Sequence, residues 1–149
     1  MPDTTTMTDK YEQDFYHWLR EQAYFMRNQA WERLDIVNLA EELDTLARKE
    51  VELLTEHLTD LLISLLKWQY CPAWRCAAAR SLVILARRKT LRLLQESASL
   101  SVEFDNCLAD AWSSAVTQAV LDTGRVEEAF PSSCPWASHL LLETTFFPD

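Results

Sequence analysis

Apolar residues recur at steps of three and four along most of the chain, the spacing that places them on one side of an α-helix. The longest such series runs from Ile36 to Trp68 and contains neither glycine nor proline. Its middle, residues 61–66, is apolar around most of a turn, and a helix of that kind is normally buried on several sides. Pro72 ends the series, because proline lacks a backbone N–H. The pattern predicts a long central helix of about 34 residues, or roughly 50 Å, with one end projecting beyond the core.

A shorter helix is expected before the long one, over residues 10–27, with Asp9 able to cap its start. Residues 28–34 are expected to form a connection in which Trp31 packs inward. Asp35 is a plausible N-cap of the long helix. The apolar stripe of the first helix, expected in the core, consists of Tyr11, Phe15, Trp18, Leu19, Ala23 and Met26.

Two further helices and a short C-terminal helix are expected after the proline. The third helix is placed at residues 73–95, with its apolar face formed by Trp74, Ala77, Ala78, Leu82, Leu85, Leu91 and Leu94. The fourth follows a linker at residues 97–99 and ends at Gly124, where a glycine in the left-handed conformation stops a helix. A short helix is expected to begin at Ser133 or Cys134. The remaining apolar residues, Trp136, Leu140, Phe146 and Phe147, would hold the C-terminus on the bundle.

The composition agrees with an all-helical chain. Its 149 residues include a single glycine and five prolines, and a sheet with hairpins usually needs more turn-forming residues than that. We therefore predict an all-α fold: a helical bundle of about four main helices, with a long central helix and a short C-terminal helix packed on the bundle. A frayed tail is expected at residues 1–8 and a single domain at residues 9–149.

The third helix is unusually basic, with Arg75, Arg80, Arg87, Arg88, Lys89 and Arg92 and no acid before Glu96. If it forms an antiparallel hairpin with the long helix, Glu56 falls beside Arg87 and Arg88, and Glu52 beside Arg92. We expect this internal charge matching to explain the arginines; the alternative is an anion or RNA site.

Net charge and cysteine content narrow the classes of partner. A formal charge of −9 argues against a nucleic-acid partner, which draws affinity from neutralised phosphates. No apolar run reaches the roughly 20 residues of a membrane span, and the first ten residues show no secretory signal. The four cysteines form no CxxC pair and are expected as reduced, largely buried thiols. We expect a cytoplasmic protein with no nucleic acid and no membrane as partner.

Several segments together resemble a bacterial family of unknown function. They are YEQDFYHWLREQA, LDIVNLAEELDTL, LLKWQYCP, the pair Thr123-Gly124, FPSSCPW and FFP, and they occur in the order typical of domain-of-unknown-function family 29. The resemblance implies an all-α fold and no assigned activity. Two departures from the family are a serine, Ser64, where members typically carry a histidine, and a mostly apolar RCAAARSLVILA where members are polar.

No complete set of metal ligands is recognisable. Asp14 and His17 form the only acid-x-x-His pair, whereas carboxylate-bridged centres need two Glu-x-x-His motifs. Cys71, Cys76, Cys134 and His139 could make a Cys3His set, but residues five apart on a helix diverge by about 140°. We predict no metal and no cofactor.

The acidic residues between Asp35 and Asp44 are the remaining candidates for acid–base catalysis. Acids near a helix start can raise one another's pKa, but the helix dipole is also a structural reason for their presence. The polar residues chosen as binding candidates are Asn38, Glu41, Glu42 and His57. The sequence favours a module that binds another protein or a copy of itself, without catalysis. The alternative is a metal-binding or acid–base enzyme using this stretch with His17 or His57.

Overall fold

The computed structural model describes residues 10–149, which divide into two compact units. The first unit ends at Ala47, and the second runs from Arg48 to Asp149. The single domain expected over residues 9–149 stays a prediction. The expected tail at residues 1–8 and the Asp9 cap lie outside the described residues.

The first unit is a pair of helices held by local caps. Helix α2 spans Phe15–Arg27, and its N-cap Asp14 accepts a hydrogen bond from the backbone N–H of His17 at 3.0 Å. The helix ends because Gln29 takes a left-handed conformation with φ 57°, which lets Ala30 donate back to the carbonyl of Phe25. A 3-10 helix at Trp31–Arg33 then leads to helix α3, Ile36–Tyr70.

The first unit has a very small core. Trp18, Gln22 and Phe25 of α2 are its only fully buried side chains among the described residues. The predicted core stripe was therefore wrong for Phe15 and Leu19, which are exposed, and Met26 is exposed as well. Trp31, expected to pack inward, is 59% exposed. The physical reason is that two helices cover only one side of each other, so the rest of each apolar arc stays in water.

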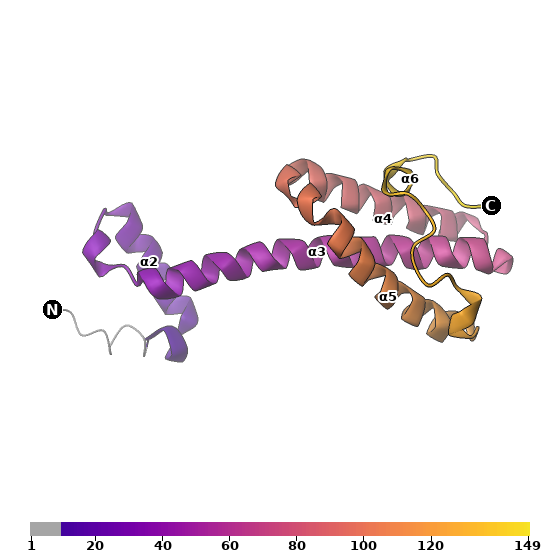
Figure 1. Cartoon of the computed structure of the whole chain (residues 1–149). Helices are drawn as coiled ribbons and strands as arrows, with labels where there is room; N and C mark the ends of the chain where they lie inside the picture. Colours follow the sequence, from indigo (N-terminus) through magenta and orange to yellow (C-terminus); the bar gives the residue numbers. More distant parts are fainter. Residues whose placement is uncertain (1–9) are drawn as a thin grey trace. The chain divides into compact units, whose positions relative to one another are not determined.

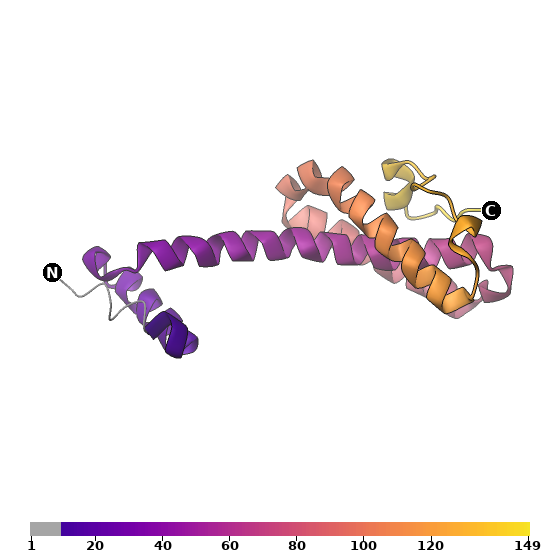
Figure 2. The ribbon, with the colours of Figure 1, turned by 60° about the horizontal axis from the view of Figure 1, so that its bottom comes forward.

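The second unit contains the remainder of α3 together with helix α4, Ala77–Glu96, and helix α5, Phe104–Thr123. Figures 1 and 2 show α4 and α5 alongside the C-terminal half of α3. Short 3-10 helices connect them, and helix α6, Ser138–Leu142, is the last element. Residues 10–149 contain no strand, so the predicted all-α fold is confirmed.

The core of the second unit lies along α3, as predicted. Six leucines of α3 are fully buried: Leu54, Leu58, Leu61, Leu62, Leu65 and Leu66. Helix α5 faces them with small residues, Cys107, Ala111, Ala115 and Ala119, which allow close approach. The α5 helix ends at Gly124 with φ 68°, which confirms the expected left-handed cap. At 35 residues, α3 also confirms the predicted long helix.

Helix α4 begins later than predicted and buries a different face. Pro72–Trp74 form a 3-10 helix, and Cys76 caps α4 by accepting from the backbone N–H of Ala79. The buried residues of α4 are Val83, Ala86, Arg87, Thr90 and Leu93. Leu82 and Leu85, predicted to face inward, are 57% and 50% exposed. The apolar residues of α4 cover more than one side, so spacing alone did not identify the buried side.

The C-terminal segment is tied to α4 by one buried arginine. Arg87 donates from Nε to the carbonyl of Leu141 at 2.8 Å, from Nη1 to Thr144 at 3.3 Å and from Nη2 to Phe146 at 2.8 Å. Burial lowers the pKa of its guanidinium. The expected short helix does form, but it begins at Ser138 rather than at Ser133 or Cys134.

The predicted charge matching between α3 and α4 was wrong. Within residues 10–149, Glu52 and Glu56 make no ion pair with the α4 arginines. Arg87 binds backbone carbonyls instead, and Arg92 pairs with Glu96 one turn later on its own helix at 2.8 Å. A guanidinium has five donors, so several carbonyls can take the place of one carboxylate.

Candidate functional site

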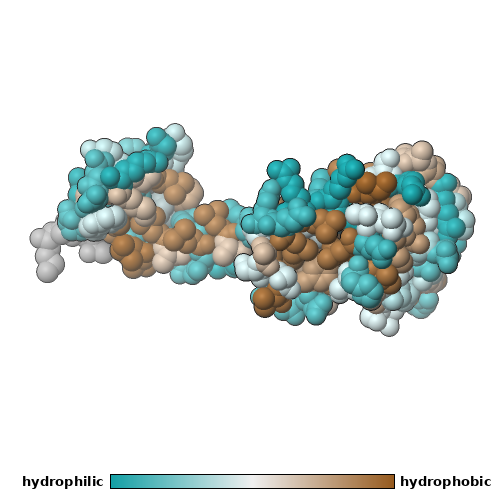
Figure 3. Space-filling model, turned by 90° about the horizontal axis from the view of Figure 1, so that it is seen from above, coloured by the Kyte–Doolittle hydropathy of each residue, from teal (hydrophilic) through white to brown (hydrophobic). Residues whose placement is uncertain are grey.

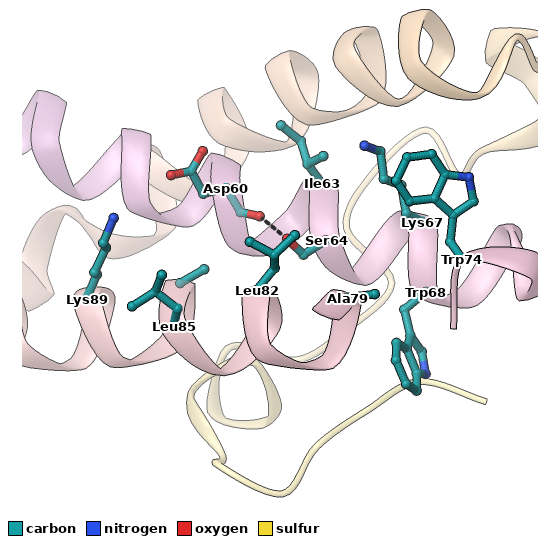
Figure 4. Close-up of a pocket in the computed structure, with 11 residues that line it drawn as sticks. Asp60, Ile63, Ser64, Lys67, Trp68, Trp74, Ala79, Leu82, Leu85 and Lys89 are labelled. Atoms are coloured by element: carbon teal, nitrogen blue, oxygen red, sulfur yellow. Dashed lines mark hydrogen bonds between the residues drawn. The ribbon is translucent and has the colours of Figure 1, made fainter. Parts of the chain in front are cut away.

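A groove between α3 and α4 is one of the concave features of the second unit. It has a volume of about 300 Å³, near the lower end of the range for ligand sites. Ile63 and Ser64 line it from α3, and Leu82 and Leu85 line it from α4 (Figure 4). Trp74, which is 47% exposed, lines it from the connection before α4. The apolar side chains of the groove are thus open to water, where a partner could bury them.

Two lysines lie at the ends of this groove. Lys67 stands over the ring of Trp74, with Nζ 4.4 Å from the ring centroid, and also forms an ion pair with Asp122. The hydrogen bond from this lysine lowers the pKa of Asp122. Lys89 lines the other end, close to Asp60 in Figure 4. The hydroxyl of Ser64 is already used, since it donates to the carbonyl of Asp60 at 2.8 Å.

The exposed side of α4 carries positive charge with few acidic partners. In the part of the chain that the structure describes, Arg88 and Lys89 form no ion pair with an acid. Arg80 lies over the ring of Phe147 at 4.5 Å rather than beside a carboxylate. The groove lining itself carries two lysines against one acid, Asp60, and Lys67 is also paired with Asp122. This groove was not predicted, because the helical spacing of Leu82 and Leu85 placed them in the core.

Most of the predicted polar site residues lie in the first unit, where Asp35 is the centre of a hydrogen-bond network. Its Oδ2 accepts from the amide of Asn38 at 2.7 Å and from Trp18 Nε1 at 3.2 Å. Oδ1 accepts from the backbone N–H of Asn38 at 3.3 Å, which confirms Asp35 as the cap of α3. Its own N–H donates to Gln22 Oε1 at 2.8 Å. These bonds hold α2 against the start of α3.

Glu42 makes a separate hydrogen bond near this network. The hydroxyl of Tyr11 donates to Glu42 Oε1, and this hydrogen bond raises the pKa of the phenol. The ring of Tyr11 packs against that of Trp18, with the centroids 4.8 Å apart. Glu41 is exposed, and His57 is half-buried on the part of α3 that belongs to the second unit. The structure thus joins Asn38 to Asp35 by hydrogen bonds and places Glu42 beside this network through Tyr11. The choice of these residues as binding sites stays a prediction.

Replacing Asp35 with alanine tests whether the network is structural. The change removes the α3 cap and the acceptor for buried Trp18, so we expect a loss of about 1–3 kcal/mol in the stability of the first unit. Amide hydrogen exchange of residues 15–47 measures this loss. The exposed Glu41→Ala is the control, expected to stay within about 0.5 kcal/mol. Unchanged protection in the Asp35 variant would contradict the structural role.

Side chains that could bind a metal ion do not form a cluster among residues 10–149. Within residues 10–149, no group of three or more histidine, cysteine, aspartate and glutamate side chains could hold an ion. All four cysteines are free; Cys107 is buried, whereas Cys76 is exposed, which corrects the expectation of largely buried thiols. Burial raises the pKa of the half-buried Cys134 thiol.

A comparison with protein-family models identifies the chain. Residues 10–147 match the model described as domain of unknown function DUF29. The chain belongs to this family. The match covers both units, which supports the resemblance carried by the sequence segments. Searches among curated proteins and among solved structures found no match. Across the described residues of this DUF29 member, no helix is both long and apolar enough to cross a membrane.

Proposed function

We propose that this DUF29 protein is a non-catalytic interaction module of the bacterial cytoplasm, and that its α3–α4 groove binds an amphipathic helix of another protein. The observation that carries the proposal is the pair of exposed leucines, Leu82 and Leu85, beside the exposed ring of Trp74. Apolar side chains at such spacing on a groove wall fit the i, i+3 and i+4 anchors of a bound helix. Aromatic side chains are also common energetic centres of interfaces.

Charge indicates the kind of helix that fits. Lys67 and Lys89 lie at the two ends of the groove against one lining acid, Asp60, and Arg88 is exposed on α4 next to Lys89. A partner helix with glutamates flanking its apolar anchors would meet these cations, which favours correct partners and faster association. An apolar floor between the cations suits such a helix better than a nucleic-acid backbone, which offers no apolar side chains.

A designed peptide tests the proposed groove. The probe is a fluorescein-labelled helical peptide of about 18 residues, roughly 27 Å long, with leucine anchors and flanking glutamates. A matched peptide carries lysines in place of the glutamates. Fluorescence anisotropy should show binding of the glutamate peptide, at least about tenfold tighter than the lysine peptide, and weaker at high salt.

The variant Leu82→Asp should weaken binding of the glutamate peptide by about tenfold or more, because it places a carboxylate on the apolar wall. The control Leu121→Asp changes an exposed leucine of α5 outside the groove and should bind like the wild type. Equal binding by both variants, or tight salt-dependent binding of RNA with no binding of either peptide, would contradict the proposal.

A further inference from the structure

The first unit leaves most of its large apolar side chains partly in water. Trp18 and Phe25 are its only buried apolar side chains among residues 10–47, whereas ten large apolar side chains there are 38–75% exposed. Figure 3 shows a group of hydrophobic residues on this unit beside a hydrophilic area. Two buried side chains are a small core even for two helices, since the stability of short helices comes mainly from packing an amphipathic face. An exposed apolar surface of this kind is typical of a protein–protein interaction site.

The exposed residues of α3 form one apolar arc. Ile36, Leu43 and Leu46 are exposed, and Leu39 between them is half-buried. Their spacing of three, four and three residues is the a/d pattern of a coiled coil, and places them within about 80° around the helix. Ala40 and Ala47 border the arc, and small side chains there allow close approach of a second helix.

Helix α2 adds a second exposed arc next to its buried side. Phe15, Leu19 and Met26 lie at spacings of four and seven residues and are each about two-fifths exposed. They lie within about 40° of one another around the helix, beside buried Trp18 and Gln22. These are residues that the sequence predicts to be in a core. Among the described residues of this unit, none covers these side chains.

The exposed apolar area of the two arcs is enough for a dimer. Six large apolar side chains lie in the arcs, about half exposed on average, and at on the order of 200 Å² each they leave on the order of 600 Å² in water. Stable protein–protein interfaces bury about 800 Å² on each partner, of which about 65% is apolar in homodimers. Ordinary monomers leave apolar patches of about 300–600 Å², so the arcs lie at the upper end of that range.

We infer that a second copy of this chain covers these two arcs, so that the first unit is a homodimerisation element. A two-fold interface brings the same patch of each copy together, and an a/d series packs on a copy of itself by interdigitating its leucines. The nearby acids do not oppose this pairing: Glu41 and Asp44 lie outside the apolar arc, and Glu42 is hydrogen-bonded to Tyr11. An arc without charge has no feature that would select a different, charged partner.

Light scattering and sedimentation equilibrium of the full chain test the dimer. The wild type is expected at twice its monomer mass of 17.3 kDa at tens of micromolar. The double variant Leu43→Asp with Leu46→Asp is expected to raise the dimer dissociation constant by about 100-fold or more, because each interface then contains four carboxylates. The matched control, Val102→Asp with Leu121→Asp, makes the same charge change at exposed positions of the second unit and should stay dimeric.

Circular dichroism checks that helix content is retained. If the aspartates reduce it, Leu43→Ala with Leu46→Ala gives a second test, because alanine favours helix while removing the anchors; it should weaken the dimer by about tenfold or more. A wild-type monomer at hundreds of micromolar, or equal dissociation of the first-unit and control variants, would overturn the inference. Peptide binding in the groove does not depend on this outcome, so the two proposals can fail separately.

Discussion

The variant Leu62→Asp is expected to unfold the second unit. Leu62 is completely buried in the central stretch of α3, among the leucines that α4 and α5 cover. An unpaired charge in such a place costs several kcal/mol, and the lost leucine packing costs about 2–5 kcal/mol more. Together they approach the total stability of a domain, about 5–15 kcal/mol. Circular dichroism, thermal melting and the yield of soluble protein measure the effect.

The control for this prediction is Leu121→Asp on α5, which makes the same chemical change at a position that is 72% exposed. It should change stability by no more than about 0.5 kcal/mol. A soluble Leu62 variant with the melting temperature of the wild type would show that the centre of α3 is not the core of the unit.

The second large effect is expected at Arg87. Replacing it with methionine keeps similar bulk but removes the donors to the carbonyls of Leu141, Thr144 and Phe146. We expect a loss of about 2–5 kcal/mol, because the remaining carbonyls lose charged donors at the edge of the core. The segment from Ser138 onward should then exchange its amide hydrogens faster and be cleaved earlier by proteases.

Two further variants separate the contributions of charge and geometry at this site. Arg87→Lys keeps the charge but cannot reach three carbonyls at once, so its stability should lie between those of the wild type and the methionine variant. Arg88→Met removes the neighbouring exposed arginine, and should stay within about 0.5 kcal/mol of the wild type. Equal stability of the Arg87 and Arg88 methionine variants would show that the C-terminal segment is held by its apolar residues alone.

Several features of the fold could be predicted because they depend on residues close together in the chain. Asp35 caps α3 through the amide group three residues later, and Gly124 ends α5 because it takes a left-handed conformation. Pro72 marks the end of the long helix. The run at residues 61–66, apolar except for Ser64, also identified the centre of the second core, because it is apolar around most of a turn.

The candidate site was harder to predict. Asn38 and Glu42 were chosen from their position near a helix start. The structure joins Asn38 to Asp35, whereas Glu42 accepts a hydrogen bond from Tyr11, which lies before α2. The α3–α4 groove was missed altogether. Its walls, including Leu82 and Leu85, carry the same residue types as a core, so their exposure could not be read from their spacing.

The sequence by itself determined that the chain is helical, where its helices are and how the longest of them ends, since hydrogen bonds and caps within a few residues decide these features. Only the tertiary structure decided which side of α4 is buried and which apolar residues of the first unit stay in water, since burial depends on which neighbours are present. It also decided the role of Arg87, whose carbonyl partners lie 54 to 59 residues further along the chain. A local pattern shows that a side chain is apolar or charged, but its partner is fixed by the packing of distant segments.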